Sequence, residues 1–282
     1  GTSDITLGGN VTLDDLVLTS ADQLTLGGTW AIAGNLDLTN LAGVVLTANS
    51  NLNAGSGNII FDGANSLNGA FTLSLTGTTL TLPTVGNITP LSALTTNASG
   101  VLTLLGNTTT NVDQNHNGST INLGGTLTSA VGDIQLHDPV LLTADTTLLA
   151  SSGNITADST INSAAGLSEY DLTLTATGGT ATLTGLVGGS HAVDAFTASG
   201  NAIVTNGVHS TVGQTYNAPT TLQGNYSTDN GTITFNAATT LAGTTGLNTA
   251  TGNNFFGSTR RTPVLCRPAR RRRWSNPRPD ES

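Results

Sequence analysis

The sequence predicts an all-β fold, a parallel β-helix (β-solenoid) in which coils of about 20 residues stack on one another. Three observations support this prediction. Apolar residues alternate with Thr, Ser or Asp, similar short runs recur at a nearly constant spacing, and the segments between them are rich in Gly and Asn. A set of β-sandwich repeats is the alternative architecture, because hairpin-connected strands would bury the same alternating pattern.

The alternation has the period of strands with one buried face, since side chains two residues apart point to the same side of a strand. Thr on the opposite face adds strand propensity without adding a large apolar surface. The clearest examples are Ile5–Leu7, Leu24–Leu26, Leu36–Leu38, Leu73–Leu75, Leu80–Leu82, Leu102–Leu104, Leu172–Leu174 and Ile233–Phe235.

The spacing of these runs indicates stacking. The phrase Ile-Thr-Leu-Gly-Gly at 5–9 matches Leu-Thr-Leu-Gly-Gly at 24–28 with an offset of 19, and the similar run 44–46 follows at an offset of 20. A constant period of this size is typical of a solenoid, in which each coil packs only on its neighbours. Gly and Asn in the turns favour it further, because both enter left-handed backbone conformations. Stacked Asn and Thr can also form hydrogen-bonded ladders between coils.

A longer repeat of about 100 residues overlies the coils. Residues 85–100 resemble residues 187–200, and Gln-Asn-His-Asn at 114–117 aligns with Gln-Thr-Tyr-Asn at 214–217. A unit of this length corresponds to about five coils of about 20 residues. His116 and Tyr216 fall at equivalent positions, which indicates a structural slot.

The interior is expected to contain Leu, Ile, Val and Ala, with Phe61, Phe71, Phe196 and Phe235 filling wider layers. Each buried Leu or Ile contributes about 1.5–3 kcal/mol. A coil with roughly six inward residues is therefore expected to be stable only between two neighbouring coils.

Charge divides the chain into a body at 1–257 and a tail at 258–282. Residues 1–259 contain 15 acidic side chains and neither Lys nor Arg, whereas all eight Arg lie between Arg260 and Arg278. This acidity argues against nucleic-acid binding by the body, because phosphates are bound by Lys and Arg. No apolar run approaches 18 residues, so no transmembrane helix is expected. The absence of a leader sequence suggests an internal piece of a longer protein.

The tail at 258–282 shows no strand alternation and contains half of the eight Pro residues. We expect it to be disordered. One interpretation is a shifted reading frame or truncation at the end of an incomplete gene. The others are a disordered linker and a native basic arm that binds nucleic acid, anionic lipid or an acidic partner.

Candidate reactive residues are few, and the sequence predicts no catalytic, cofactor-binding or metal-binding residues. The pair His137-Asp138 has the composition of half an acid–base or metal site, but we favour the interpretation of His137 as a solvated loop residue before Pro139. No two His residues have a metal-ligand spacing. The four lie at His116, His137, His191 and His209.

Clustered Asp residues would indicate an enzyme, because polysaccharide-cleaving β-helices use such carboxylates. Asp14-Asp15 is the only adjacent pair. No Lys or Arg in residues 1–259 is present to stabilise an anionic substrate. Calcium-binding repeats, a phosphate-binding loop and a nucleophile elbow are absent from the sequence. No enzyme and no cofactor are therefore predicted.

Several phrases resemble the repetitive passenger regions of filamentous-haemagglutinin-like proteins and autotransporters. They are Gly-Asn-Ile-Thr at 153–156, Leu-Thr-Leu-x-Gly, Val-Gly-Gly at 187–189 and Gln-Thr-Tyr-Asn-Ala-Pro at 214–219. The resemblance covers about residues 1–257. It implies a right-handed parallel β-helix in a large bacterial exoprotein, located outside the cell or at the outer-membrane surface.

The function expected from the resemblance is that of an adhesin shaft or a structural surface module, without enzymatic activity. The implied partners are host-cell or matrix glycans and proteins, or further copies of the chain. Strong glycan binding needs aromatic platforms, and the body offers only Trp30, Tyr170, Tyr216 and Tyr226. A fragment of a β-helix polysaccharide-degrading enzyme is the alternative.

Overall fold

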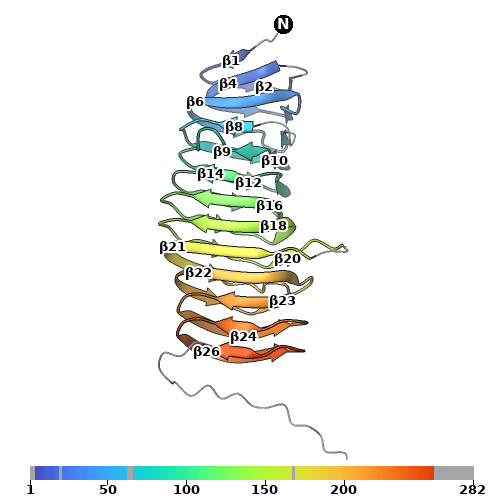
Figure 1. Ribbon diagram of the computed structural model, residues 1–282. Helices are drawn as coiled ribbons and strands as arrows, with labels where there is room; N and C mark the ends of the chain where they lie inside the picture. The colour runs from blue at the N-terminus through green and yellow to red at the C-terminus, as the bar shows by residue number, and fades with distance from the viewer. Residues whose placement is uncertain (1–3, 19–20, 62–65, 167–168, 257–282) are drawn as a thin grey trace, which may run out of the picture.

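The computed structural model describes residues 4–18, 21–61, 66–166 and 169–256, which form a β-solenoid of about 12 coils. The coils average about 21 residues, and the described residues contain no helix. Figure 1 shows them stacked into one elongated rod, with the N-terminal coil at the top. The predicted fold is confirmed. The predicted tail at 258–282 lies outside the described residues.

Twenty-seven short or corner-spanning strands make up the described coils. In chain order they are β1 (Ile5–Leu7), β2 (Val11–Leu13), β3 (Leu16–Val17), β4 (Ala21–Ile32), β5 (Leu36–Asp37), β6 (Leu41–Asn53), β7 (Ile59–Ile60), β8 (Ser66–Asn68), β9 (Leu73–Gly77), β10 (Leu80–Leu82), β11 (Thr84–Val85), β12 (Leu94–Ala98), β13 (Val101–Leu104), β14 (Thr108–Thr110), β15 (Gln114–Asn117), β16 (Thr120–Ser129), β17 (Ile134–Leu136), β18 (Val140–Ala150), β19 (Ile155–Ala157), β20 (Ile161–Ser163), β21 (Leu172–Leu183), β22 (Val193–Thr205), β23 (Val208–Tyr216), β24 (Thr220–Thr228), β25 (Ile233–Phe235), β26 (Thr239–Thr249) and β27 (Asn254–Phe256).

Each coil contributes three strand segments, so the rod has three faces, which we call sheets 1, 2 and 3. One inward column on sheet 1 contains Ile5, Leu24, Val44, Leu67, Val85, Thr108, Leu127, Leu148, Leu174, Ala198, Tyr216, Phe235 and Phe256. The column on sheet 2 contains Val11, Trp30, Leu52, Leu75, Thr96, His116, Leu136, Ala157, Leu183, Thr205, Leu222 and Leu241. The column on sheet 3 contains Leu16, Leu36, Ile59, Leu80, Leu102, Ile121, Val140, Ile161, Val187, Val208, Tyr226 and Leu247.

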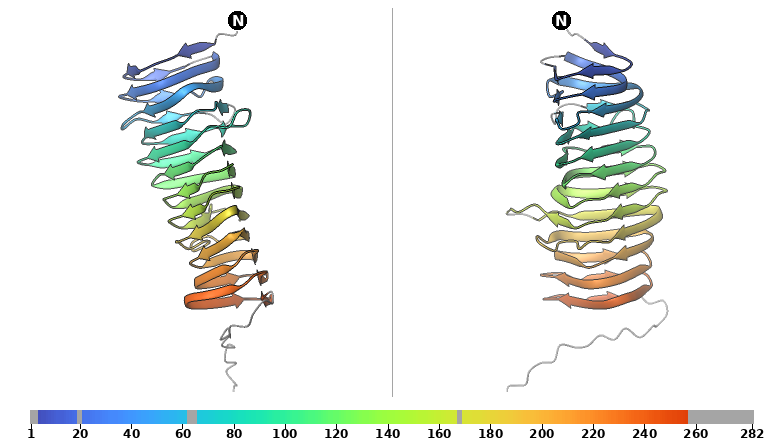
Figure 2. Two further views of the ribbon diagram at one scale, coloured as in Figure 1. Left: turned by 90° about the vertical axis from the view of Figure 1, so that its left-hand side faces the viewer. Right: turned by 180° about the vertical axis from the view of Figure 1, so that it is seen from behind.

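All pairings between the described strands are parallel, as the long pairing of β21 with β22 illustrates. Figure 2 shows from two further sides that successive coils lie one above another. Hairpin-connected sandwich repeats would pair neighbouring strands antiparallel. The β-sandwich alternative is therefore wrong.

The core is a continuous stack of buried apolar side chains, as the alternation predicts. Phe61, Phe196 and Phe235 are each 1% exposed, whereas Phe71 is only half-buried and packs against the edge of the core. Tyr216 and Phe235 stack with ring centroids 4.7 Å apart. Such pairs add about 0.5–1.5 kcal/mol beyond the burial of their area.

Asn and Asp at the corners tie each coil to the next. The side-chain oxygen of Asp15 accepts from the amide of Asn35 at 2.6 Å, and Asn35 in turn accepts from Asn58 at 3.0 Å. A second ladder runs from Asp113 through Asp133 to Asn154. These bonds satisfy amides at places where the chain leaves its strand, each contributing about 0.5–1.5 kcal/mol. The predicted hydrogen-bonded ladders are confirmed for Asn, with Asp in the same role, whereas Thr takes no part in these two ladders.

The 100-residue repeat is real, but its two copies lie on different faces. Gly86 and Gly188 have φ angles of 70° and 72°. A Cβ on either one would collide with a carbonyl oxygen of the next coil, that of Thr109 or His209. The residues just before these glycines, Val85 and Val187, lie on sheets 1 and 3 respectively.

The change of face between the two copies follows from the number of coils in one repeat. Four full coils lead from Gln114 to Ile203 along one column of sheet 2. Gln214 follows two faces later, on sheet 1. The unit therefore spans four and two-thirds coils, slightly fewer than the five expected, because the coils are longer than 20 residues on average.

Candidate functional site

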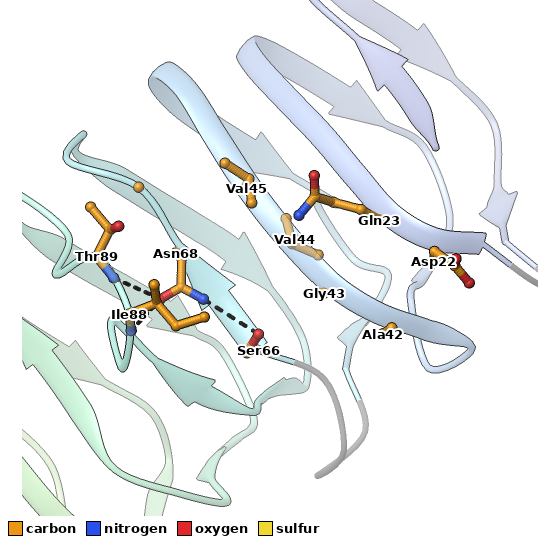
Figure 3. Close-up of a pocket in the computed structure, with 11 residues that line it drawn as sticks. Asp22, Gln23, Ala42, Gly43, Val44, Val45, Ser66, Asn68, Ile88 and Thr89 are labelled. Carbon is orange, nitrogen blue, oxygen red and sulfur yellow. Dashed lines mark hydrogen bonds between the residues drawn. The ribbon is translucent and has the colours of Figure 1, made fainter. Parts of the chain in front are cut away.

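A cavity of about 340 Å3 opens on sheet 1 between β4 and the loop that follows β11 (Figure 3). Its walls include the apolar side chains of Val44, Val45 and Ile88. The side chain of Asn68 has a structural role, because its Oδ1 accepts hydrogen bonds from the backbone amides of Ile88 at 2.9 Å and Thr89 at 3.1 Å. The cavity is large enough for a small polar ligand such as a sugar unit.

The chemistry of the lining is sparse. Among the described residues that line this cavity, Asp22 is the only one with an ionisable side chain. Glycoside hydrolysis ordinarily requires two carboxylates placed on either side of the scissile bond. A smaller cavity of about 190 Å3 on sheet 2 is lined by Thr182, Val204, Gln223 and other uncharged residues. Among the described residues, neither cavity presents the pair of carboxylates that acid–base catalysis of glycoside hydrolysis needs.

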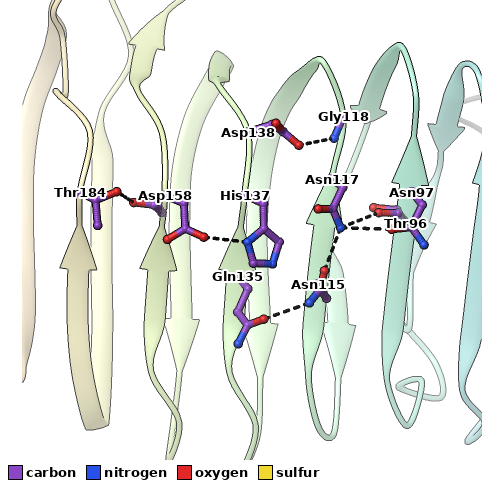
Figure 4. Close-up of polar contacts among 11 residues, drawn as sticks. Thr96, Asn97, Asn115, Asn117, Gly118, Gln135, His137, Asp138, Asp158 and Thr184 are labelled. Atoms are coloured by element: carbon purple, nitrogen blue, oxygen red, sulfur yellow. Dashed lines mark hydrogen bonds and ion pairs between the residues drawn. The ribbon is translucent and has the colours of Figure 1, made fainter.

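A cluster of polar side chains lies on the outer surface of sheet 2 (Figure 4). We call it the sheet 2 polar column. The Nδ2 of Asn117 donates to the Oδ1 of Asn97 at 3.2 Å, and His137 Nδ1 lies 2.7 Å from Asp158 Oδ2. The column consists of Asn97, Asn117, His137, Asp158 and Thr184, contributed by successive coils.

His137 does not pair with its sequence neighbour. Asp138 instead accepts a hydrogen bond from the amide of Gly118 at 2.9 Å, and the partner of His137 is Asp158, one coil further along. His209 and Asp229 form a similar contact of 3.2 Å, again one coil apart. Both pairs are missed by a search for local motifs and would be found by adding one coil length to the position of each His.

These His–Asp pairs offer little for catalysis or metal binding. The side chains of His137 and Asp158 are 33% and 43% exposed. A pair this accessible to solvent contributes at most about 1 kcal/mol. In the part of the chain that the structure describes, no three His, Cys, Asp or Glu side chains are placed to hold a metal ion. The pairs therefore act as links between coils on a solvated face.

His116 lies in the core of sheet 2, where substrate has no access. It is fully buried. Its Nδ1 lies 3.0 Å from the hydroxyl of Thr96, and its Nε2 lies 3.4 Å from Oε1 of Gln114. Burial, together with the smaller effect of the nearby charge of His137, lowers the pKa of His116 from its ordinary value of 6.5 to about 4. The imidazole is therefore neutral near pH 7.

Tyr216 occupies the equivalent position in the second copy of the repeat. Its hydroxyl donates to Oε1 of Gln214 at 2.9 Å, and burial raises its pKa. In both copies the glutamine Nε2 donates to a backbone carbonyl six residues earlier, at Thr108 or Val208. The interpretation of these positions as one structural slot is confirmed.

The remaining candidates are also structural. Asp15 of the acidic pair caps the next coil, as described above. Trp30, Tyr216 and Tyr226 are completely buried, and Tyr170 is half-buried against the core. Three of the four aromatic residues that were considered as glycan platforms therefore point inward.

The fold and these surfaces define a β-solenoid repeat protein. No family model matches the chain, and it has no significant match among curated proteins or solved structures. Within the described residues there is no helix with the length and hydropathy needed to cross a membrane.

Proposed function

We propose that this chain is a non-enzymatic rod segment of a large secreted or cell-surface bacterial repeat protein, acting as an adhesin shaft or a structural surface module. The observation that carries the proposal is the uninterrupted stack of about 12 coils around one core. With strands about 4.8 Å apart, the stack is roughly 58 Å long. Such a rod holds whatever is attached to its end at a fixed distance.

The links between coils support a mechanical role. Backbone ladders join the coils on all three faces, and side-chain ladders such as Asp113–Asp133–Asn154 add bonds at the corners. Bending the rod would stretch many of these bonds together. A spacer needs this stiffness, and it needs no reactive side chain.

The charge of the body supports an extracellular surface role with selected partners. Residues 1–259 carry 15 acidic and no basic side chains. This excess of negative charge repels anionic polymers and keeps the rods soluble. Neutral or cationic host-cell and matrix components, or further copies of the rod, are the partners that fit.

The proposal is tested by combining shape, binding and activity measurements on the 282-residue chain. Small-angle scattering is expected to give the profile of a rod. Incubation with neutral and acidic polysaccharides is expected to release no new reducing ends. Specific cleavage of any polysaccharide would overturn the non-enzymatic assignment, and binding to a panel of glycans and matrix proteins would distinguish an adhesive segment from a passive shaft.

A further inference from the structure

Sheet 1 carries an outward-facing column of six threonines on six successive coils, between β16 and β25. We call it the threonine column. It consists of Thr126, Thr147, Thr173, Thr197, Thr215 and Thr234. Each of these side chains is half-buried and points outward, because the residues before and after it in the strand point inward or lie at the corner.

The column is geometrically regular. Thr147, Thr173 and Thr197 pair directly with one another in unbroken stretches of parallel sheet. The register shifts next to these stretches lie outside them, between Leu123 and Gly125, between Ala176 and Thr180, and between Val193 and Ala195. Successive threonines are therefore separated by one strand spacing of about 4.8 Å. The two further views in Figure 2 show the same even stacking of these coils.

The hydroxyl groups of the column are free to bind something outside the protein. Of these six threonine side chains, only that of Thr234 has a hydrogen bond within the part of the chain that the structure describes, a 3.5 Å contact with the hydroxyl of Thr232. The sheet 2 polar column differs, because its members bond to one another, as His137 does to Asp158. Free hydroxyls at a constant spacing form a preorganised array, whereas the sheet 2 groups are already paired.

The residues that follow the threonine column along each strand are uncharged, whereas Asp145 and Asp171 border its other side and accept hydrogen bonds from backbone amides of the next coil. A second outward column lies two residues further along each strand and contains Thr128, Leu149, Thr175, Ser199, Asn217 and Asn236. Neither column includes an acidic residue, although the body as a whole is strongly acidic. This strip of sheet 1 is therefore a neutral grid of hydroxyl, methyl and amide groups.

We propose that the threonine column is a binding surface for ice. Each hydroxyl can anchor one water molecule, and each methyl group restricts the orientation of the water beside it. Anchored waters repeat at the strand spacing, which is close to the repeat of oxygen atoms on a hexagonal ice surface. A rigid column loses almost no conformational entropy when it binds, so weak contacts made in register add up.

A crystalline neutral polysaccharide is the competing partner for a flat uncharged face. Sugar rings are bound most strongly by exposed aromatic side chains. The aromatic residues stacked beneath the column, Tyr216 and Phe235, are buried. The surface chemistry of the column therefore favours water over sugar. The inference is independent of the spacer role, since a passive rod needs no regular face.

The test measures ice binding by the 282-residue chain. Labelled protein is partitioned between a slowly growing ice phase and the liquid, and the gap between melting and freezing temperatures is recorded. The double variant Thr173→Val with Thr197→Val removes two hydroxyls and keeps the methyl groups and the strand propensity. A second double variant, Thr173→Lys with Thr197→Lys, places two long, positively charged side chains in the threonine column. Matched controls make the same changes at Thr156 and Thr182, which pair on the outer side of sheet 2.

The wild-type chain is expected to enter the ice phase, the valine variant to enter less, and the lysine variant to be excluded like a protein that does not bind ice. The controls at Thr156 and Thr182 are expected to match the wild type. Circular dichroism at the same temperature verifies the fold of every variant. Exclusion of the wild type from ice, or an equal loss in the controls, would overturn the proposal, as would binding to crystalline cellulose or chitin without binding to ice.

Discussion

Protonation of His116 is expected to destabilise the rod in mild acid. The pKa of this buried imidazole is about 4 in the folded chain, against an ordinary value of 6.5. Between these two values the unfolded chain binds a proton that the folded chain does not. Stability therefore rises with pH across this window, is fully present above 6.5, and is lost as pH falls toward 4. The difference corresponds to roughly 3 kcal/mol.

The measurement is urea denaturation followed by circular dichroism at several pH values from 4 to 7. The test variant is His116→Leu, which extends the apolar column from Leu136 by one coil, up to Thr96. It leaves Thr96 and Gln114 with fewer partners, so it is expected to cost about 1–3 kcal/mol at pH 7. It also removes the titrating group.

The informative quantity is the difference between the two proteins at each pH. Exposed carboxylates titrate in both chains and cancel in this difference. The wild type is expected to lose roughly 3 kcal/mol more than His116→Leu between pH 7 and pH 4. His209→Gln serves as the exposed control and should retain the steep wild-type dependence, because His209 does not contribute to the pKa shift of His116. Parallel curves for the wild type and His116→Leu would refute a buried neutral histidine at this position.

Three further substitutions test the fold. Gly188→Ala is expected to lower the melting temperature, because its Cβ meets a carbonyl oxygen at positive φ, whereas Gly189→Ala has only ordinary contacts and serves as its control. Leu174→Asp buries a charge and is expected to unfold its coil, detected by loss of the β-type circular dichroism, while Thr175→Asp on the outer side should be tolerated. Asn35→Ala removes one side-chain ladder bond and is expected to cost about 1 kcal/mol in urea denaturation; an unchanged midpoint would show that the ladder is dispensable.

The coil architecture could be predicted because it depends on local rules. Alternation placed Leu24 and Leu26 inward, and the offset of 19 between the first two strands placed Ile5 on Leu24. Alternation also carries the information that Trp30 faces inward, since it is two residues from the buried Ile32. The alternation therefore argues against Trp30 as a surface platform for glycans.

The surface contacts were harder to predict because they join residues a whole coil apart, and coil length varies. The step from Leu148 to Leu174 is 26 residues, whereas the step from Ala198 to Tyr216 is 18. An error of one residue in such a step exchanges the inner and outer faces of a strand. The partner of His137 therefore depends on the length of one particular corner, which composition and average period do not specify.

The fractional coil count of the long repeat determines how the rod presents its surface. The corner loops after Gly86 and Gly188 are nearly identical, yet they project from the rod about one-third of a revolution apart. If the unit were repeated further, such loops would follow a spiral staircase rather than a straight row. A flat target would then meet only every third loop, whereas a neighbouring rod lying alongside could engage loops from any direction.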